Sequence, residues 1–151
     1  MTEQRILFTR DNFKAEIAAI FRKHGLDITP NPQVDIKGWV WRVRTLNPLF
    51  HFVYAKYEST TRFYTANRDA KRPDIWKNGA KTINLKLFAH LAHMKPLVIF
   101  ADPYFIRAIS YYDVATTGVV FTQQSNYEEV IGVDVNDLIG LDKYLEMNNK
   151  P

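Results

Sequence analysis

The sequence predicts an α/β fold: a mixed central sheet that contains an antiparallel three-strand meander and is flanked by helices. Three observations lead to this prediction. An amphipathic helical pattern opens the chain, three short β-rich runs follow it, and a second helical pattern leads into one continuous apolar run. The predicted order is α-β-β-β-α-β with a C-terminal α/β extension, in a chain of 151 residues that has the length of one domain.

The first helix is predicted from "TRDNFKAEIAAIFRKHGLDI". Asp11 or Asn12 can cap its start, and apolar residues recur at helical spacing between Phe13 and Phe21. Gly25 is typical of the residue that ends a helix. The stretch "ITPNPQ" that follows contains two prolines, which predicts a turn.

Three β-rich runs come next: "VDIKGWVWRVRT", "LFHFVYAKYE" and "TTRFYTANR". Their connections are short, as in an antiparallel meander. Because strand side chains alternate between the two faces of a sheet, Tyr54, Lys56 and Glu58 share one face of the second run.

The second half of the chain alternates between helical and strand patterns. "RPDIWKNGAKTINLKLFAHLAHM" predicts a long helix with Asp74 as its cap, and "KPLVIFA" predicts a strand buried on both faces. Beyond it, "FIRAISYYDV" predicts a strand or a turn and a strand, and "VVFTQQ" predicts another strand. "VDVNDLIGLDKYLEMN" predicts a final helix capped by Asp134 or Asn136.

Charge is distributed unevenly along the chain, although the net charge is only +4. Residues 1–107 contain 18 Lys and Arg against 9 Asp and Glu, whereas residues 108–151 contain 2 against 7. We therefore predict a basic α/β core over 1–107 and an acidic extension over 108–151, packed on the same domain. A basic face of this kind favours a nucleic-acid partner, most simply DNA. The candidate nucleic-acid-binding residues are Lys37, Arg42, Arg44, Arg62, Arg68, Lys71 and Arg72.

Several classes are excluded as motif-based assignments. The chain contains no cysteine, which removes disulfides, thiolate metal sites and cysteine nucleophiles. It has no phosphate-binding loop, dinucleotide fingerprint or G-x-S-x-G motif. The longest apolar run, "PLVIFA", is far shorter than the roughly 20 residues needed to cross a bilayer. We expect a cytoplasmic protein without a membrane partner.

The segment from Phe13 to about Ile106 resembles the core of the restriction-endonuclease-like, PD-(D/E)xK nuclease superfamily, with a layout similar to archaeal Holliday-junction resolvases. The resemblance implies a magnesium-dependent DNA endonuclease or phosphodiesterase. Glu16, Asp35 and Glu58 would then hold the metal, and Lys56 and Glu58 would be the catalytic pair. The family's E-x-K falls on Tyr54-Ala55-Lys56 here, so the strand carries its lysine and glutamate in reversed order.

A second interpretation belongs to a different class. The chain would be a non-enzymatic interaction protein of a mobile element, whose basic sheet binds nucleic acid or an acidic protein surface. Its acidic tail would mediate self-association into a homodimer. Aromatic residues that interleave with the basic ones, such as Trp39 and Trp41, fit either a base-stacking platform or the core beneath the sheet. We interpret His90 and His93 as a pair on a helix face without metal.

Overall fold

The computed structural model describes residues 5–30, 39–44, 51–59, 79–123 and 127–148. In chain order these residues form α1 (Phe13–Lys23), β1 (Asp27–Pro30), β2 (Trp39–Arg44), β3 (Phe52–Tyr57), β4 (Ala80–Asn84), α2 (Leu85–His90), the 3-10 turn η2 (Leu91–His93), β5 (Leu97–Ala101), β6 (Ile106–Ser110), α3 (Tyr111–Thr117), β7 (Val119–Thr122), β8 (Glu129–Asp134), the 3-10 turn η3 (Val135–Asp137), β9 (Ile139–Gly140) and α4 (Leu141–Asn148).

The strands form two sheets. Sheet A has the order β1-β2-β3-β5-β6-β9, and sheet B has the order β4-β8-β7. Strands β3 and β5 run parallel, while the other pairs are antiparallel. The predicted α/β fold with a mixed sheet is therefore confirmed. The antiparallel meander of the described residues is β1-β2-β3, and it contains the first two of the three predicted strands as β2 and β3.

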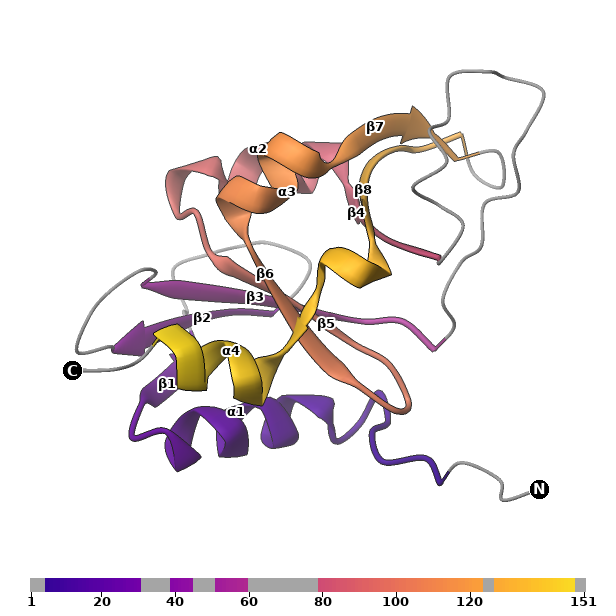
Figure 1. Cartoon of the computed structure of the whole chain (residues 1–151). Coiled ribbons are helices and arrows are strands. Elements are labelled where there is room, and N and C mark those ends of the chain that lie inside the picture. The colour runs from indigo at the N-terminus through magenta and orange to yellow at the C-terminus, as the bar shows by residue number, and fades with distance from the viewer. Residues whose placement is uncertain (1–4, 31–38, 45–50, 60–78, 124–126, 149–151) are drawn as a thin grey trace.

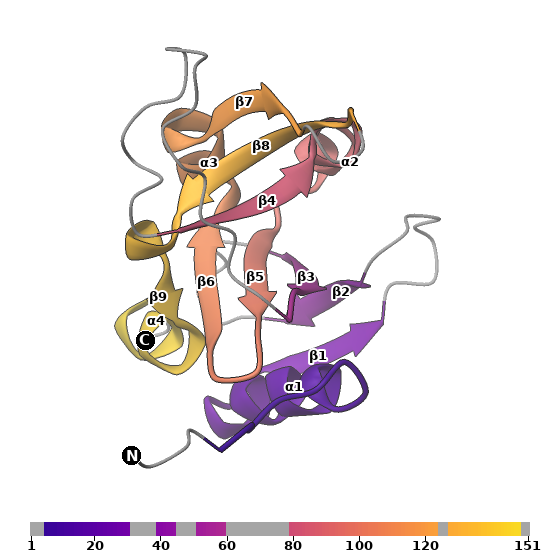
Figure 2. The ribbon, with the colours of Figure 1, turned by 90° about the vertical axis from the view of Figure 1, so that its right-hand side faces the viewer.

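Sheet A separates two layers of the molecule (Figures 1 and 2). Helices α1 and α4 cover one of its faces, and sheet B covers the other together with α2 and α3. Strand β5 contributes to both cores: Leu97 and Ile99 pack on the α1 side, and Val98 and Phe100 on the sheet B side. All five of its residues are buried, which confirms the prediction made from its continuous apolar run.

Helix α1 follows its predicted pattern. Phe13, Ile17 and Phe21 are buried along one stripe, and each buried side chain of this size contributes about 1.5–3 kcal/mol. The Asn12 side chain accepts a hydrogen bond from the Thr9 backbone N–H at 2.7 Å, which holds the turn that leads into the helix. After the helix, Gly25 has a φ of +74°, a conformation that glycine adopts without steric cost.

The turn predicted from the prolines of "ITPNPQ" is wrong for the first half of that segment, and the second half lies outside the described residues. Its first three residues, Ile28 to Pro30, belong to β1. Ile28 is buried against α1, so the strand has an apolar contact that holds it in place. Pro30 is tolerated because β1 is an edge strand of sheet A, a position where proline is found within sheets.

The predicted helix before β5 is wrong over residues 80–84. Residues Ala80–Asn84 form strand β4, and only the following six residues form α2. Asn84 separates the two elements, since its side chain accepts a hydrogen bond from the Leu87 N–H at 3.0 Å and thereby caps the helix. The predicted cap Asp74 lies outside the described residues, as does the third predicted strand at 60–68.

The C-terminal part contains more elements than the sequence patterns predict. Strand β6 leads into α3, capped by the Ser110 hydroxyl, where the pattern predicted a strand or a turn and a strand. The final helix starts at Leu141, not at the predicted caps. Asp134 caps the short turn η3 instead, and β9 follows that turn and pairs with β6. Within the described parts of the chain, no helix has the length and apolar character required to span a bilayer.

Candidate functional site

Five charged side chains converge where β3 and β5 end, and we refer to them as the charged cluster: Lys56, Glu58, Lys81, Asp102 and Arg107. The two strands are parallel neighbours, so their carboxyl ends lie at the same edge of sheet A. The Glu58 N–H extends this pairing by donating to the Ala101 carbonyl at 2.9 Å. This edge lies on the right-hand side of the view in Figure 1. In open α/β sheets, ligands bind outside the carboxyl ends of parallel strands.

The first pair of the cluster comes from β3 and the residue after it. The Lys56 Nζ lies 2.6 Å from the Glu58 Oε1 and also donates to the Thr82 carbonyl of β4 at 2.7 Å. Lys56 therefore connects sheet A to sheet B. Its side chain remains 33% exposed, whereas that of Glu58 is only 13% exposed. The lysine is the member of this pair that solvent and ligands can reach.

Asp102 organises the turn between β5 and β6. Its Oδ1 accepts hydrogen bonds from the backbone N–H groups of Tyr104 and Phe105, both at 2.8 Å. Its Oδ2 lies 3.6 Å from the Lys81 Nζ and 3.6 Å from the Arg107 Nη1. One buried carboxylate thus fixes the backbone of a turn and balances two cations.

Lys81 is the most buried charge of the cluster, with its side chain 1% exposed. It shares a strand face with Ile83, which packs in the core between the two sheets. Among the described residues its Nζ has no hydrogen-bond acceptor. Burial lowers the pKa of the Lys81 ammonium below its usual value, and the nearby carboxylates of Glu58 and Asp102 oppose that shift.

Tyr54 lies on β3 on the same face as Lys56 and Glu58, and it packs in the core below them. Its burial, and secondarily the charge of Glu58, raise the pKa of the Tyr54 phenol to about 12. The phenol is therefore neutral at physiological pH and supplies no additional charge to the cluster.

The balance of the cluster is three cations against two carboxylates. Glu58 is in contact with a lysine, and Asp102 with a lysine and an arginine, so both carboxylates are already neutralised. Across the described ranges no three carboxylate or histidine side chains group together in a way that could hold a metal ion. His90 and His93 are both exposed at the end of α2 and in η2. The arrangement attracts an anion more readily than a cation.

The structure describes only part of the predicted site. Glu58 and Lys56 lie in the charged cluster, whereas Glu16 is exposed on α1, which covers the other face of sheet A. Asp35 lies outside the described residues, so the predicted metal-binding set stays a prediction.

The predicted nucleic-acid-binding residues fall mainly outside the described ranges as well. Arg42 and Arg44 belong to β2, where Arg42 pairs with Phe52 of β3 and Arg44 with Asp27 of β1. The others lie outside the described residues: Lys37, Arg62, Arg68, Lys71 and Arg72.

Sequence reasoning missed three members of the cluster. A signal for Asp102 was present, because a carboxylate directly after a fully buried strand lies at the edge where ligands of α/β proteins bind. Lys81 could not be found in this way, because its segment was predicted as helix. Arg107 depends on the pairing of β6 with β5, in which it lies opposite Phe100.

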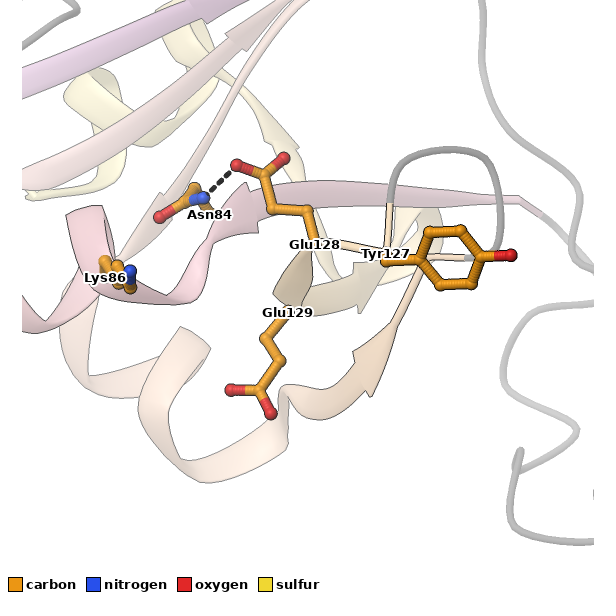
Figure 3. Close-up of a pocket in the computed structure, with 5 residues that line it drawn as sticks. All are labelled: Asn84, Lys86, Tyr127, Glu128 and Glu129. Atoms are coloured by element: carbon orange, nitrogen blue, oxygen red, sulfur yellow. Dashed lines mark hydrogen bonds between the residues drawn. The ribbon is translucent and has the colours of Figure 1, made fainter.

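A hollow lies at the opposite end of β4 from Lys81. It has a volume of about 640 Å³ and is lined by Asn84, Lys86, Tyr127, Glu128 and Glu129 (Figure 3). The Asn84 side-chain amide donates to the Glu128 carboxylate, and the ring of Tyr127 points away from the other four residues. Two carboxylates against one lysine make this hollow unfavourable for a phosphate. It is therefore a poorer candidate than the charged cluster for a polyanion.

No protein-family model, curated protein or solved structure gives a significant match to this chain.

Proposed function

We propose that the protein binds nucleic acid at the edge of sheet A formed by the carboxyl ends of β3 and β5. The observation that carries this proposal is the convergence of three cations on two carboxylates there, which leaves an excess of positive charge. Phosphate oxygens are bound mainly by lysine and arginine side chains, and such contacts need no sequence-specific geometry. Lys56, one-third exposed, is the cluster residue best placed to meet a phosphate.

The connectivity of the chain supports the same edge. The chain leaves sheet A after Glu58 and enters sheet B at Ala80, one residue before Lys81. The described residues that flank the segment 60–78 therefore adjoin two members of the charged cluster in the sequence. This segment contains four of the predicted nucleic-acid-binding residues: Arg62, Arg68, Lys71 and Arg72.

Magnesium-dependent cleavage is the second candidate activity, because the resemblance to the nuclease superfamily implies it. The carboxylates of Glu58 and Asp102 lie at the ends of adjacent parallel strands, as a metal site would require. As they stand, however, both carboxylates are neutralised by cations, and no third carboxylate or histidine joins them among the described residues. These residues do not fit a metal ion, so we derive no catalytic step from one. The proposal is binding without hydrolysis.

The proposal is tested by measuring binding and cleavage of branched, duplex and single-stranded DNA, with and without magnesium, at two salt concentrations. If all seven predicted basic residues contact phosphates, affinity should fall roughly 10³- to 10⁴-fold between 50 and 200 mM salt. An affinity that does not change with salt concentration would contradict the proposal. Magnesium-dependent cleavage would show instead that the carboxylates rearrange to bind metal.

A matched pair of variants tests the edge itself. Lys56→Gln should weaken binding and lower the slope of log affinity against log salt by about 1, because one phosphate contact is lost. Lys143→Gln is the control, because this exposed lysine lies on α4, which covers the other face of sheet A. If the two variants bind equally well, Lys56 does not contact the nucleic acid.

A further inference from the structure

The turn between β5 and β6 presents two large rings to solvent beside the charged cluster. The side chains of Tyr104 and Phe105 are 36% and 46% exposed. Both residues directly follow the Asp102-Pro103 step, so they lie at the edge where β3 and β5 end. Figure 2 shows this turn as the tip of a hairpin that projects beyond the sheet, close to the start of α1.

The N-terminal segment enlarges this apolar surface. The backbone N–H groups of Leu7 and Phe8 donate to the Pro103 carbonyl at 2.9 and 3.1 Å, which holds the segment against the hairpin tip. Ile6 and Leu7 are themselves 60% and 56% exposed. We refer to Ile6, Leu7, Tyr104 and Phe105 as the apolar tip. They account for four of the eight large hydrophobic residues exposed in the described parts of the chain.

The backbone of the tip is rigidly held although its side chains are exposed. Asp102 accepts hydrogen bonds from the N–H groups of both ring-bearing residues, and its own N–H donates to the Phe105 carbonyl at 2.9 Å. The rings are therefore presented from a fixed turn. A preorganised surface loses less conformational entropy when a ligand binds.

Arginine side chains accompany the apolar tip, one in contact with a ring and two beside it in the sequence. The Arg107 guanidinium lies 4.0 Å from the centre of the Phe105 ring, and Arg10 lies 5.5 Å from the centre of the Tyr57 ring. Arg5 and Arg10 flank the apolar residues of the N-terminal segment and are both exposed. Exposed rings interspersed with arginine side chains are the combination by which proteins hold unpaired bases and their phosphates.

We propose that the apolar tip is a stacking surface for unpaired bases, so that the nucleic acid bound at this edge is single-stranded or branched. This inference rests on the proposed function and specifies its substrate class. Bases within a continuous duplex are stacked on one another and cannot reach the rings, whereas bases at a fork, junction or single strand can. Phosphates would lie along the cations while the exposed bases meet Tyr104 and Phe105.

The test compares binding of a single strand, a fork and a blunt duplex by wild type, Tyr104→Ala/Phe105→Ala and a control. The control is Tyr112→Ala on α3, which removes an even more exposed ring that has a cation, Lys95, 5.2 Å from its centre. The double variant should lose roughly 5- to 100-fold affinity for the single strand and the fork, the effect of losing a stacked base. Its affinity for the blunt duplex, and the control's affinity for all three, should change less than twofold.

The other outcomes distinguish failure of the stacking proposal from failure of the proposed function. If wild type binds DNA and the double variant binds all three forms as wild type does, the stacking surface is wrong and the proposed function stands. If wild type binds none of them, both fail. Sedimentation of the same proteins tests whether a second copy of the chain binds at the apolar tip instead. If the wild type is a dimer and the double variant is a monomer, the tip is an interface between copies. Crosslinking of a 5-iodouracil-containing strand to the 102–107 peptide of wild type would directly support stacking.

Discussion

At the level of single residues, burial raises the pKa of Tyr54, which packs below the charged cluster. Tyr54 is 3% exposed, and its pKa is raised to about 12 from an ordinary value near 10. The unfolded chain therefore loses this proton at lower pH than the folded protein does. Above pH 10 the unfolded state binds fewer protons, so the stability contributed by neutral Tyr54 is complete below pH 10 and declines as pH rises toward 12.

Tyr54→Phe should remove this decline. Two pKa units correspond to roughly 2–3 kcal/mol, so the variant should lose that much less stability than wild type between pH 9 and 12. Urea unfolding across this range measures the difference, with Tyr112→Phe as the control because that ring is exposed. If the unfolding free energies of wild type and Tyr54→Phe change with pH in parallel, the raised pKa of Tyr54 is contradicted.

Asp102 and Lys81 are predicted to depend on one another. Asp102→Asn keeps the turn's acceptor but removes the carboxylate that lies 3.6 Å from the buried Lys81 ammonium, which should cost about 3 kcal/mol of unfolding free energy. Lys81→Met should cost much less, since Asp102 retains Arg107 and two backbone N–H groups. Adding Lys81→Met to Asp102→Asn should therefore restore most of the loss. Additive effects in a urea-based double-mutant cycle would show that the two side chains are not coupled.

At the level of elements, Gly118 controls how α3 joins β7. Its φ of −69° is ordinary, so space and not backbone conformation requires glycine here. A Cβ would lie 2.4 Å from the Val114 carbonyl oxygen and under 3 Å from two carbons of Ile131. The backbone at the end of α3 and the Ile131 side chain on β8 would both have to move.

Gly118→Ala should lower the unfolding free energy by roughly 2–3 kcal/mol, the cost of overpacking a closely packed site. Gly140→Ala is the matched control, because a Cβ there meets no atom within 4 Å. Its stability should stay within about 1 kcal/mol of wild type. A melting temperature for Gly118→Ala as high as that of the control would contradict the packing argument.

Some elements could be predicted from the sequence and others could not. Helix α1 and strand β5 were predictable because their patterns are contiguous and long enough to identify the buried face. Strand β4 was not, because Ile83 happens to lie at helical spacing from Leu87 and Leu91 of the helix that follows. Its identity as a strand comes from pairing with β8, almost 50 residues later, and no local pattern contains that partner.

Only part of the charged cluster could be predicted from the sequence. The shared face of Lys56 and Glu58 follows from strand alternation alone, and in the structure the two form an ion pair. Their other neighbours come from β4, the end of β5, and β6. Only the parallel pairing of β3 with β5, and the packing of sheet B on sheet A, bring these residues together.

At the level of the whole molecule, residues beyond 107 complete both layers. Strand β8 is the central strand of sheet B, and β9 closes one edge of sheet A. Helix α4 places Leu141 and Leu145 in the core beside α1. Asp142 joins the two helices at their exposed ends through Lys23 and His24, and hydrogen bonds from His24 first and Lys23 second lower the pKa of its carboxyl group.

A chain truncated after residue 107 should therefore fail to fold. It would leave β4 without its sheet partner and would expose the side of the α1 core that α4 covers. The full chain should unfold in one cooperative transition, followed in urea by circular dichroism and tryptophan fluorescence, while the truncated chain should show no transition. Removing only residues 149–151 is the control and should leave the midpoint unchanged. A cooperative transition in the truncated chain would mean instead that the basic core is stable alone, with the acidic extension as a separable addition.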